Sequence, residues 1–176
     1  MAMTLQSSYT LTPGTYLLGT VDAGPRTITT AKNANASASI PIGSPVSFKP
    51  SGATSDIDAT TPVAADKIMG ISCHADALSR SWTDENGVHG DLDATGVLVG
   101  SFFPVLRMGR IFVTCTTVCA PGQPLFVAVQ SAGAYTAAGQ MGNVTATNAI
   151  DCTGQGQWRT TATAGAGAWV EVNFLK

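Results

Sequence analysis

The sequence has little charge for its length. Aspartate, glutamate, lysine and arginine make up 11% of the 176 residues, against roughly 25% in ordinary globular domains. No charged side chain occurs from Met1 to Val21, and none occurs from Ile111 to Ile150. A protein that stays alone in solution normally keeps charge on its surface for solubility. The long neutral stretches therefore predict that neighbouring molecules cover part of the surface.

Basic clusters and long apolar runs are also missing. The nine lysines and arginines are scattered along the chain, whereas binding to a nucleic-acid backbone requires cations gathered on one surface. We therefore expect no direct nucleic-acid partner. No uncharged run approaches the ~20 mainly apolar residues of a membrane-spanning helix, so we expect no membrane partner either.

The first residues, Met1–Gln6, contain neither the basic nor the apolar segment of a signal peptide. We expect synthesis and folding in the cytoplasm, where thiols stay reduced. The four cysteines are accordingly predicted to be buried thiols, with a disulfide formed after release from the cell as the alternative. They are Cys73, Cys115, Cys119 and Cys152.

Residues for catalysis or metal binding are sparse. His74 and His89 are the two imidazoles, and no G-x-S-x-G or H-E-x-x-H pattern is present. We therefore expect no enzymatic activity, no metal and no cofactor. A zinc site would use Cys115 and Cys119, but we expect Cys115 inside a strand, where positions four apart are separated by about 13 Å, so the two cannot share an ion unless the strand ends before Cys119. The acidic residues 84–93 lack the ligand order of a calcium loop.

Short runs of β-branched and aromatic residues between glycines and prolines predict an all-β fold. The runs are Tyr16–Val21, Arg26–Thr30, Pro45–Lys49, Lys67–His74, Gly96–Gly100, Phe102–Leu106, Arg110–Val118, Leu125–Val129 and Ala168–Leu175. Turn formers at intervals of about 8–12 residues favour a single β-barrel or β-sandwich-like domain. We expect Leu125–Val129 to pair antiparallel with Arg110–Val118, and at most one helical turn, at Ala75–Ser79.

The chain is expected to divide into a peripheral and a central part. Residues 1–39 are polar and rich in small side chains, and are predicted to form an N-terminal arm or peripheral strands beside a β-barrel-like domain at residues 40–176. Within that domain, residues 80–93 collect charge and turn formers and are expected to form an exposed loop. Trp82 and His89 lie in this loop and are our candidate partner-contact residues.

Several segments follow one another in the order found in a known family. They are Gly43–Phe48 (G-x-P-V-x-F), Ala64–Ser72 (ending in I-x-G-I-S), Gly109–Val113 (G-x-I-F-V), Gly122–Val127, Gly133–Thr136, Trp158–Thr161 and Ala168–Val172. Through this ordered set the chain from about Ile40 to Lys176 resembles the structural cement proteins of tailed phages. Residues 1–39 and 80–96 have no counterpart in the pattern.

The resemblance implies a β-barrel-like virion protein that is made in the host cytoplasm and binds the outer capsid surface. It implies the major capsid protein as partner and the bridging of neighbouring capsomers as function. Symmetric sites on a capsid also favour self-association, as a homodimer or a homotrimer. The alternative is a carbohydrate-binding or host-adhesion β-module, whose candidate ligand platform is Trp82 with Trp158 and Trp169. Trp169 alternates with Val170 and is expected in the core or at an interface.

Overall fold

The computed structural model describes residues 18–49, 55–63, 67–74, 92–93, 96–131 and 133–175. These residues form strands and turns and contain no helix, which confirms the all-β prediction. The strands are β1 (Thr27–Asn33), β2 (Pro45–Phe48), β3 (Asp58–Thr60), β4 (Ile68–Ser72), β5 (Leu92–Asp93), β6 (Gly96–Val97), β7 (Phe102–Thr114), β8 (Phe126–Ala128), β9 (Met141–Gly142), β10 (Ala149–Asp151), β11 (Gly156–Trp158) and β12 (Gly167–Asn173).

Five strands close into a barrel. Around the barrel, β1 pairs with β3, β3 with β2, β2 with β4, β4 with β7, and β7 again with β1. All of these pairs are antiparallel except β1 with β3. Each of the five strands contributes to one buried apolar cluster, which is the barrel interior; its strand residues are Ala31, Val46, Ala59, Met69, Phe103 and Val105. The barrel half of the sequence prediction is therefore confirmed.

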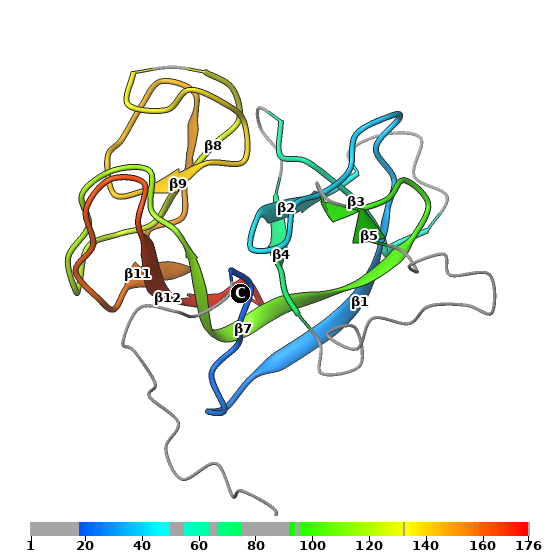
Figure 1. Ribbon diagram of the computed structural model, residues 1–176, viewed down its shortest axis with the longest axis horizontal. Helices are drawn as coiled ribbons and strands as arrows, with labels where there is room; N and C mark the ends of the chain where they lie inside the picture. Colours follow the sequence, from blue (N-terminus) through cyan, green and yellow to red (C-terminus); the bar gives the residue numbers. More distant parts are fainter. Residues whose placement is uncertain are drawn as a thin grey trace, which may run out of the picture.

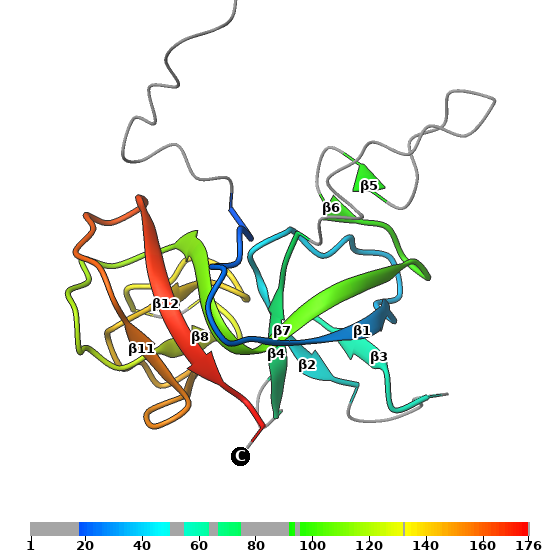
Figure 2. The same ribbon diagram turned by 90° about the horizontal axis from the view of Figure 1, so that it is seen from below.

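Strand β7 joins the barrel to a second lobe. Its first half pairs with β1 and β4, and its second half pairs with β12, which in turn pairs with β11. A separate three-stranded sheet, β10-β8-β9, completes the second lobe (Figure 1). Figure 2 shows β7 running from one lobe into the other. The changeover lies near Gly109, whose φ of 131° is a conformation that side-chain-bearing residues rarely adopt.

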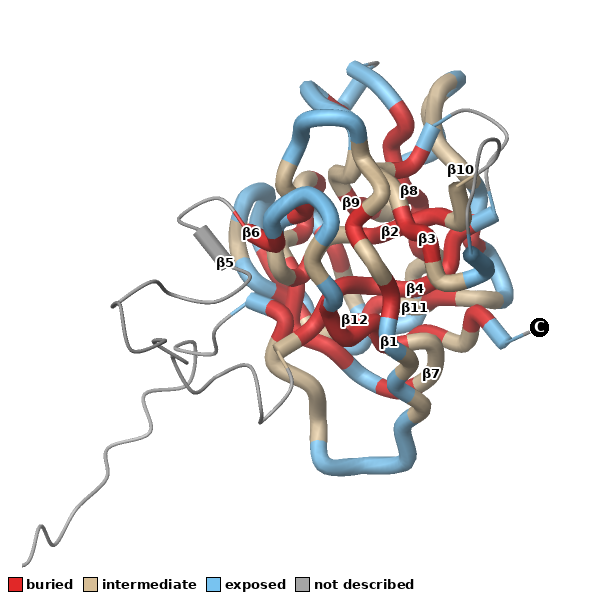
Figure 3. Tube along the Cα trace, turned by 90° about the vertical axis from the view of Figure 1, so that its right-hand side faces the viewer, coloured by how far each residue is buried: buried red, intermediate tan, exposed pale blue. Residues whose placement is uncertain are grey.

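A second buried cluster binds the two lobes to each other. Ile68 and Ile71 on the barrel strand β4 pack in the same cluster as Val127 of β8 and Trp158 of β11. Buried residues follow the strands of both lobes, while exposed residues lie mainly on the connecting loops (Figure 3). Because this core is shared, the barrel and the second lobe form one structural unit.

The structure corrects two predictions about strands. Phe102–Leu106 and Arg110–Val118 were expected to be separate strands, but β7 is continuous and ends at Thr114. The predicted pairing of Leu125–Val129 with Arg110–Val118 is wrong, because β12 occupies that edge of β7 and β8 pairs with β9 and β10. Beyond β7 the chain turns toward residues 162–166, where Cys119 and Ala162 exchange two backbone hydrogen bonds.

Part of the expected N-terminal arm belongs to the barrel. Strand β1 lies inside residues 1–39, yet it pairs with both β3 and β7, and its Ala31 and Asn33 are fully buried. Its side chains are mostly short and polar, and for this reason the sequence indicated a peripheral segment rather than a barrel strand. Residues 1–17 lie outside the described residues, as does the helical turn predicted at Ala75–Ser79. Among the residues that the structure describes, no helix is long and apolar enough to cross a membrane.

Candidate interaction surface

The predicted contact residues Trp82 and His89 lie outside the described residues. Of the other two tryptophans, Trp158 is completely buried and its indole N–H donates to the carbonyl oxygen of Gly142 at 3.2 Å. Trp169 is half-buried and packs edge-to-face on Phe112, with ring centroids 5.6 Å apart. Trp158 therefore cannot be part of a sugar-binding platform, and Trp169 has the packing role expected for it.

The four cysteines are free, buried thiols, as predicted. Burial raises the pKa of Cys73, Cys115 and Cys152 to about 12. The strand ends before both Cys115 and Cys119, because β7 stops at Thr114, so the separation expected along a strand does not apply to them. In the part of the chain that the structure describes, no three histidine, cysteine or acidic side chains gather as a metal site would require.

His74 follows strand β4 and is half-buried. Its backbone N–H donates to the carbonyl oxygen of Gly19 at 3.0 Å, which ties the end of β4 to the incoming chain. Burial lowers the pKa of its imidazole. His74 therefore lies where the end of an apolar strand meets the incoming chain.

A groove of about 770 Å³ crosses the outer face of β7, β12 and β11. The strand register creates it, because Arg110 of β7 lies opposite Glu171 of β12, and Glu171 lies opposite Gln157 of β11. Side chains alternate between the two faces of a strand. The neighbours Val170 and Val172 therefore enter the core while Glu171 faces the groove. We call this surface the β7–β12–β11 groove.

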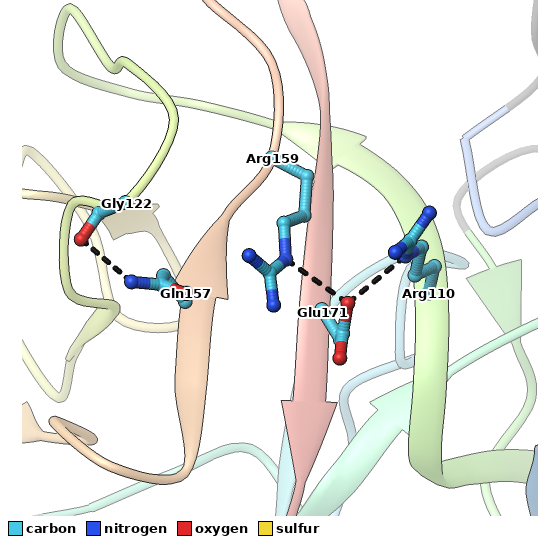
Figure 4. A network of polar contacts seen from close by, with 5 residues as sticks. All are labelled: Arg110, Gly122, Gln157, Arg159 and Glu171. Atoms are coloured by element: carbon cyan, nitrogen blue, oxygen red, sulfur yellow. Dashed lines mark hydrogen bonds and ion pairs between the residues drawn. The ribbon is translucent and has the colours of Figure 1, made fainter.

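Two arginines and one glutamate form a cluster in the β7–β12–β11 groove (Figure 4). The Nε groups of Arg110 and Arg159 both donate to Oε2 of Glu171, each at 2.9 Å. Hydrogen bonds from Arg110 and Arg159 hold the pKa of Glu171 below its usual value, so the carboxyl is ionised at neutral pH. The cluster thus holds two positive charges and one negative charge.

A glutamine fixes the wall of the groove beside the cluster. The side-chain amide of Gln157 donates to the carbonyl oxygen of Gly122 at 2.8 Å (Figure 4). Gly122 has a φ of 88°, which a glycine adopts without strain. The turn at Gly122 is therefore held against β11.

The family comparison assigns the chain. The family model described as "Structural cement protein (E217 gp24/Pam3 gp6)" matches residues 5–174. The chain belongs to this family. It is therefore a structural phage protein, and the resemblance noted in its sequence is confirmed.

The fold of this cement protein is shared with a protein of a solved phage capsid. A chain in "The capsid of Myoviridae Phage XM1" superposes with a TM-score of 0.62 at 16% sequence identity. The match covers 97% of this chain and 98% of that chain. At this identity the similarity concerns the fold. A search of curated proteins finds no match.

The second lobe of the cement protein contains a long segment without charged side chains. Residues 111–150 contain no charged side chain, and Val118 and Val144 are exposed by 64% and 42%. The loops that carry these valines lie side by side, because the hydroxyl of Thr117 donates to Oδ1 of Asn143 at 2.5 Å. We call the exposed part of residues 116–149 the neutral surface. It is the kind of surface that the low charge of the sequence predicted.

The sequence alone does not predict the arginine cluster, because Arg110 and Arg159 are two of the cations scattered along the chain. They are 49 positions apart, and only the pairing of β7 and β11 with β12 brings them to one glutamate. The sequence does show Glu171 between two valines, and this alternation places the Glu171 side chain on the outer face of a strand. That pattern predicts an exposed acidic residue but not its partners.

Proposed function

We propose that this protein binds the outer surface of a tailed-phage capsid between capsomers and stabilises the head. The observation that carries the proposal is the match of the structural cement family model over residues 5–174. The partner is then the major capsid protein, and the role is structural rather than enzymatic. In this proposal the protein self-associates on the symmetric sites that a capsid offers.

The two surfaces support an assembly role. The neutral surface can be covered by a partner without the cost of removing charges from water. Its exposed Val118 and Val144 gain from that burial, at about 25 cal/mol for each Å² of apolar surface. Modest contacts suffice, because many copies act together on one capsid.

The shared core suits the mechanical task. A cement protein must transmit load between neighbours without opening its own fold. Strand β7 is 13 residues long and hydrogen-bonds to strands in both lobes, and the buried cluster around Trp158 joins the lobes. A force applied across the protein therefore acts on a continuous strand and a packed interior.

A co-sedimentation assay tests the proposal. Heads of the parent phage that lack this protein are mixed with increasing amounts of purified protein, and the bound copies per head are counted. We expect saturation at a number equal to one class of symmetric capsid sites. Failure of the protein to bind mature heads at micromolar concentration would contradict the proposal.

A further inference from the structure

We propose that the β7–β12–β11 groove is a contact site for the major capsid protein, and that Arg110 and Arg159 bind a carboxylate side chain of that partner. This inference rests on the proposed function and names the chemistry of one contact. The groove differs from the neutral surface, because residues 116–149 have no charged side chain that could bind an oppositely charged group of the partner.

The charge of the cluster favours an anionic partner group. Arg110 and Arg159 share the single carboxylate of Glu171, so one positive charge is left over. Asp22 also lines the groove, but within the described chain it forms no ion pair with either arginine. With Asp22 the formal charge of the whole lining is zero, so a partner carboxylate would be held by direct pairing with the two guanidinium groups rather than by an overall positive charge.

The geometry leaves the right donors available. Each arginine uses Nε for Glu171, and no acceptor within the described ranges binds the terminal nitrogens of either guanidinium. A guanidinium is planar and presents paired N–H groups that match the two oxygens of a carboxylate. Because Glu171 already holds both arginines, less side-chain freedom is lost when a partner binds.

The groove admits a protein segment. Its lining contains three exposed glycines, which present backbone instead of a side chain: Gly24, Gly122 and Gly154. The side chains of Arg110 and Arg159 are exposed by 53% and 39%. Ion pairs this exposed contribute little to folding stability, so stability alone does not account for the cluster.

The experiment measures the affinity for heads of three single variants. Arg110→Ala and Arg159→Ala each remove one groove cation, and Lys67→Ala removes one exposed cation at the start of β4, outside the groove. We expect each arginine variant to bind heads about tenfold more weakly, as for the loss of a charge-assisted hydrogen bond. The Lys67→Ala variant changes the net charge by the same amount and is therefore the matched control. It should stay within about twofold of the wild type, because Lys67 lies outside the groove.

A conservative variant separates charge from geometry. Arg159→Lys keeps the positive charge but loses the planar pair of donors, so we expect its affinity to fall between those of Arg159→Ala and the wild type. Raising the salt concentration should weaken the wild type more than Arg159→Ala, since exposed charge pairs are screened. Thermal unfolding midpoints of all variants should agree within about 2 °C, because the replaced side chains are exposed.

The outcomes distinguish this inference from the proposed function. If the wild type binds heads and the arginine variants bind equally well, the groove inference is wrong and the function stands. If the wild type does not bind, the proposed function itself fails. If the arginine variants bind heads normally but lose self-association in sedimentation velocity, the groove contacts a second copy, for example its acidic residues 84–93, and the assignment to the capsid protein is overturned.

Discussion

At the scale of residues, the second lobe is organised around Trp158. This is the largest fully buried side chain in the described structure, and the backbone of Gly142 lies against it and accepts its indole hydrogen bond. A Cβ at Gly142 would lie 2.6 Å from Oγ1 of Thr117 and 2.8 Å from the hydroxyl of Tyr135. Strand β9 therefore fits against Thr117 and Tyr135 only because position 142 has no side chain.

We predict that Trp158→Phe lowers the free energy of unfolding by roughly 2–4 kcal/mol, because it creates a cavity and leaves the Gly142 carbonyl without its donor. Trp169→Phe is the matched control. Trp169 is half-buried and its ring has the same aromatic neighbour available, so we expect a loss of about 1 kcal/mol or less. Urea unfolding measures both, and equal losses would contradict the assigned role of Trp158.

The buried thiols give a prediction about pH. The pKa values of Cys73, Cys115 and Cys152 rise from 9.0 to about 12 in the folded protein. Between these values the unfolded chain loses protons that the folded chain keeps, so the stability from these groups is complete below pH 9 and declines as the pH rises toward 12. We predict that a thiol reagent at pH 8 labels none of these three cysteines on the native protein within minutes and labels all of them in urea. Rapid labelling of any of the three in the native state would contradict their burial.

At the scale of elements, closure of the barrel depends on a close approach of β4 to β7. A Cβ at Gly70 of β4 would lie 2.4 Å from the carbonyl oxygen of Leu106 and 2.5 Å from a methyl group of Val105. The clash would involve backbone, which cannot rotate away. The barrel therefore requires glycine at position 70. The sequence shows the motif I-x-G-I-S around Gly70, but not the close approach of β7 that explains it.

We therefore predict that Gly70→Ala lowers the free energy of unfolding by more than about 2 kcal/mol, as expected for overpacking in a core. Gly24→Ala is its control, because a Cβ at position 24 meets nothing within 4 Å and its φ is not in the left-handed region. That control should change stability by less than about 0.5 kcal/mol. Chemical denaturation compares the two, and a neutral Gly70→Ala would contradict the tight β4–β7 crossing.

The neutral N-terminal segment supports a proposal about assembly. Residues 1–15 carry no charge, and we propose that they act as an arm in capsid contacts. We predict that their removal leaves cooperative unfolding intact and weakens binding to heads. Loss of the cooperative transition in the shortened protein would show instead that the segment belongs to the folded core.

The longer and more apolar strands could be predicted from the sequence, and the shorter ones could not. β2, β4 and β12 have runs of valine, isoleucine or aromatic residues, and their positions agree with the prediction within two residues. β3, β9 and β10 have two or three residues each and exist through their pairing rather than their own composition. The pairing of β7 was mispredicted because the turn at Pro121–Gly122 suggested a local hairpin, whereas β12, which lies far along the chain, occupies that edge.

At the scale of the whole molecule, two different surfaces follow from one charge pattern. Charge is absent from residues 111–150, which supply the neutral surface. Three charged side chains, Arg110, Arg159 and Glu171, meet in the β7–β12–β11 groove. Low overall charge predicted the neutral surface, but the groove depends on strand register and required the structure.

A protein with two distinct contact surfaces and one continuous core can hold two neighbours at a fixed separation. Holding neighbouring capsid subunits in this way is what a cement protein is expected to do. In the proposed binding mode the neutral surface would supply apolar contact area and the groove a charge-dependent contact, and the buried cluster around Trp158 joins the two lobes that carry them. The arginine variants proposed for the groove test its contact without changing the neutral surface.

The most direct test of the central claim is the temperature at which heads lacking this protein release their DNA, measured with and without saturating protein. We predict that the protein raises the release temperature by several degrees, because bound copies must detach before neighbouring capsomers separate. An unchanged release temperature at full occupancy would contradict the account.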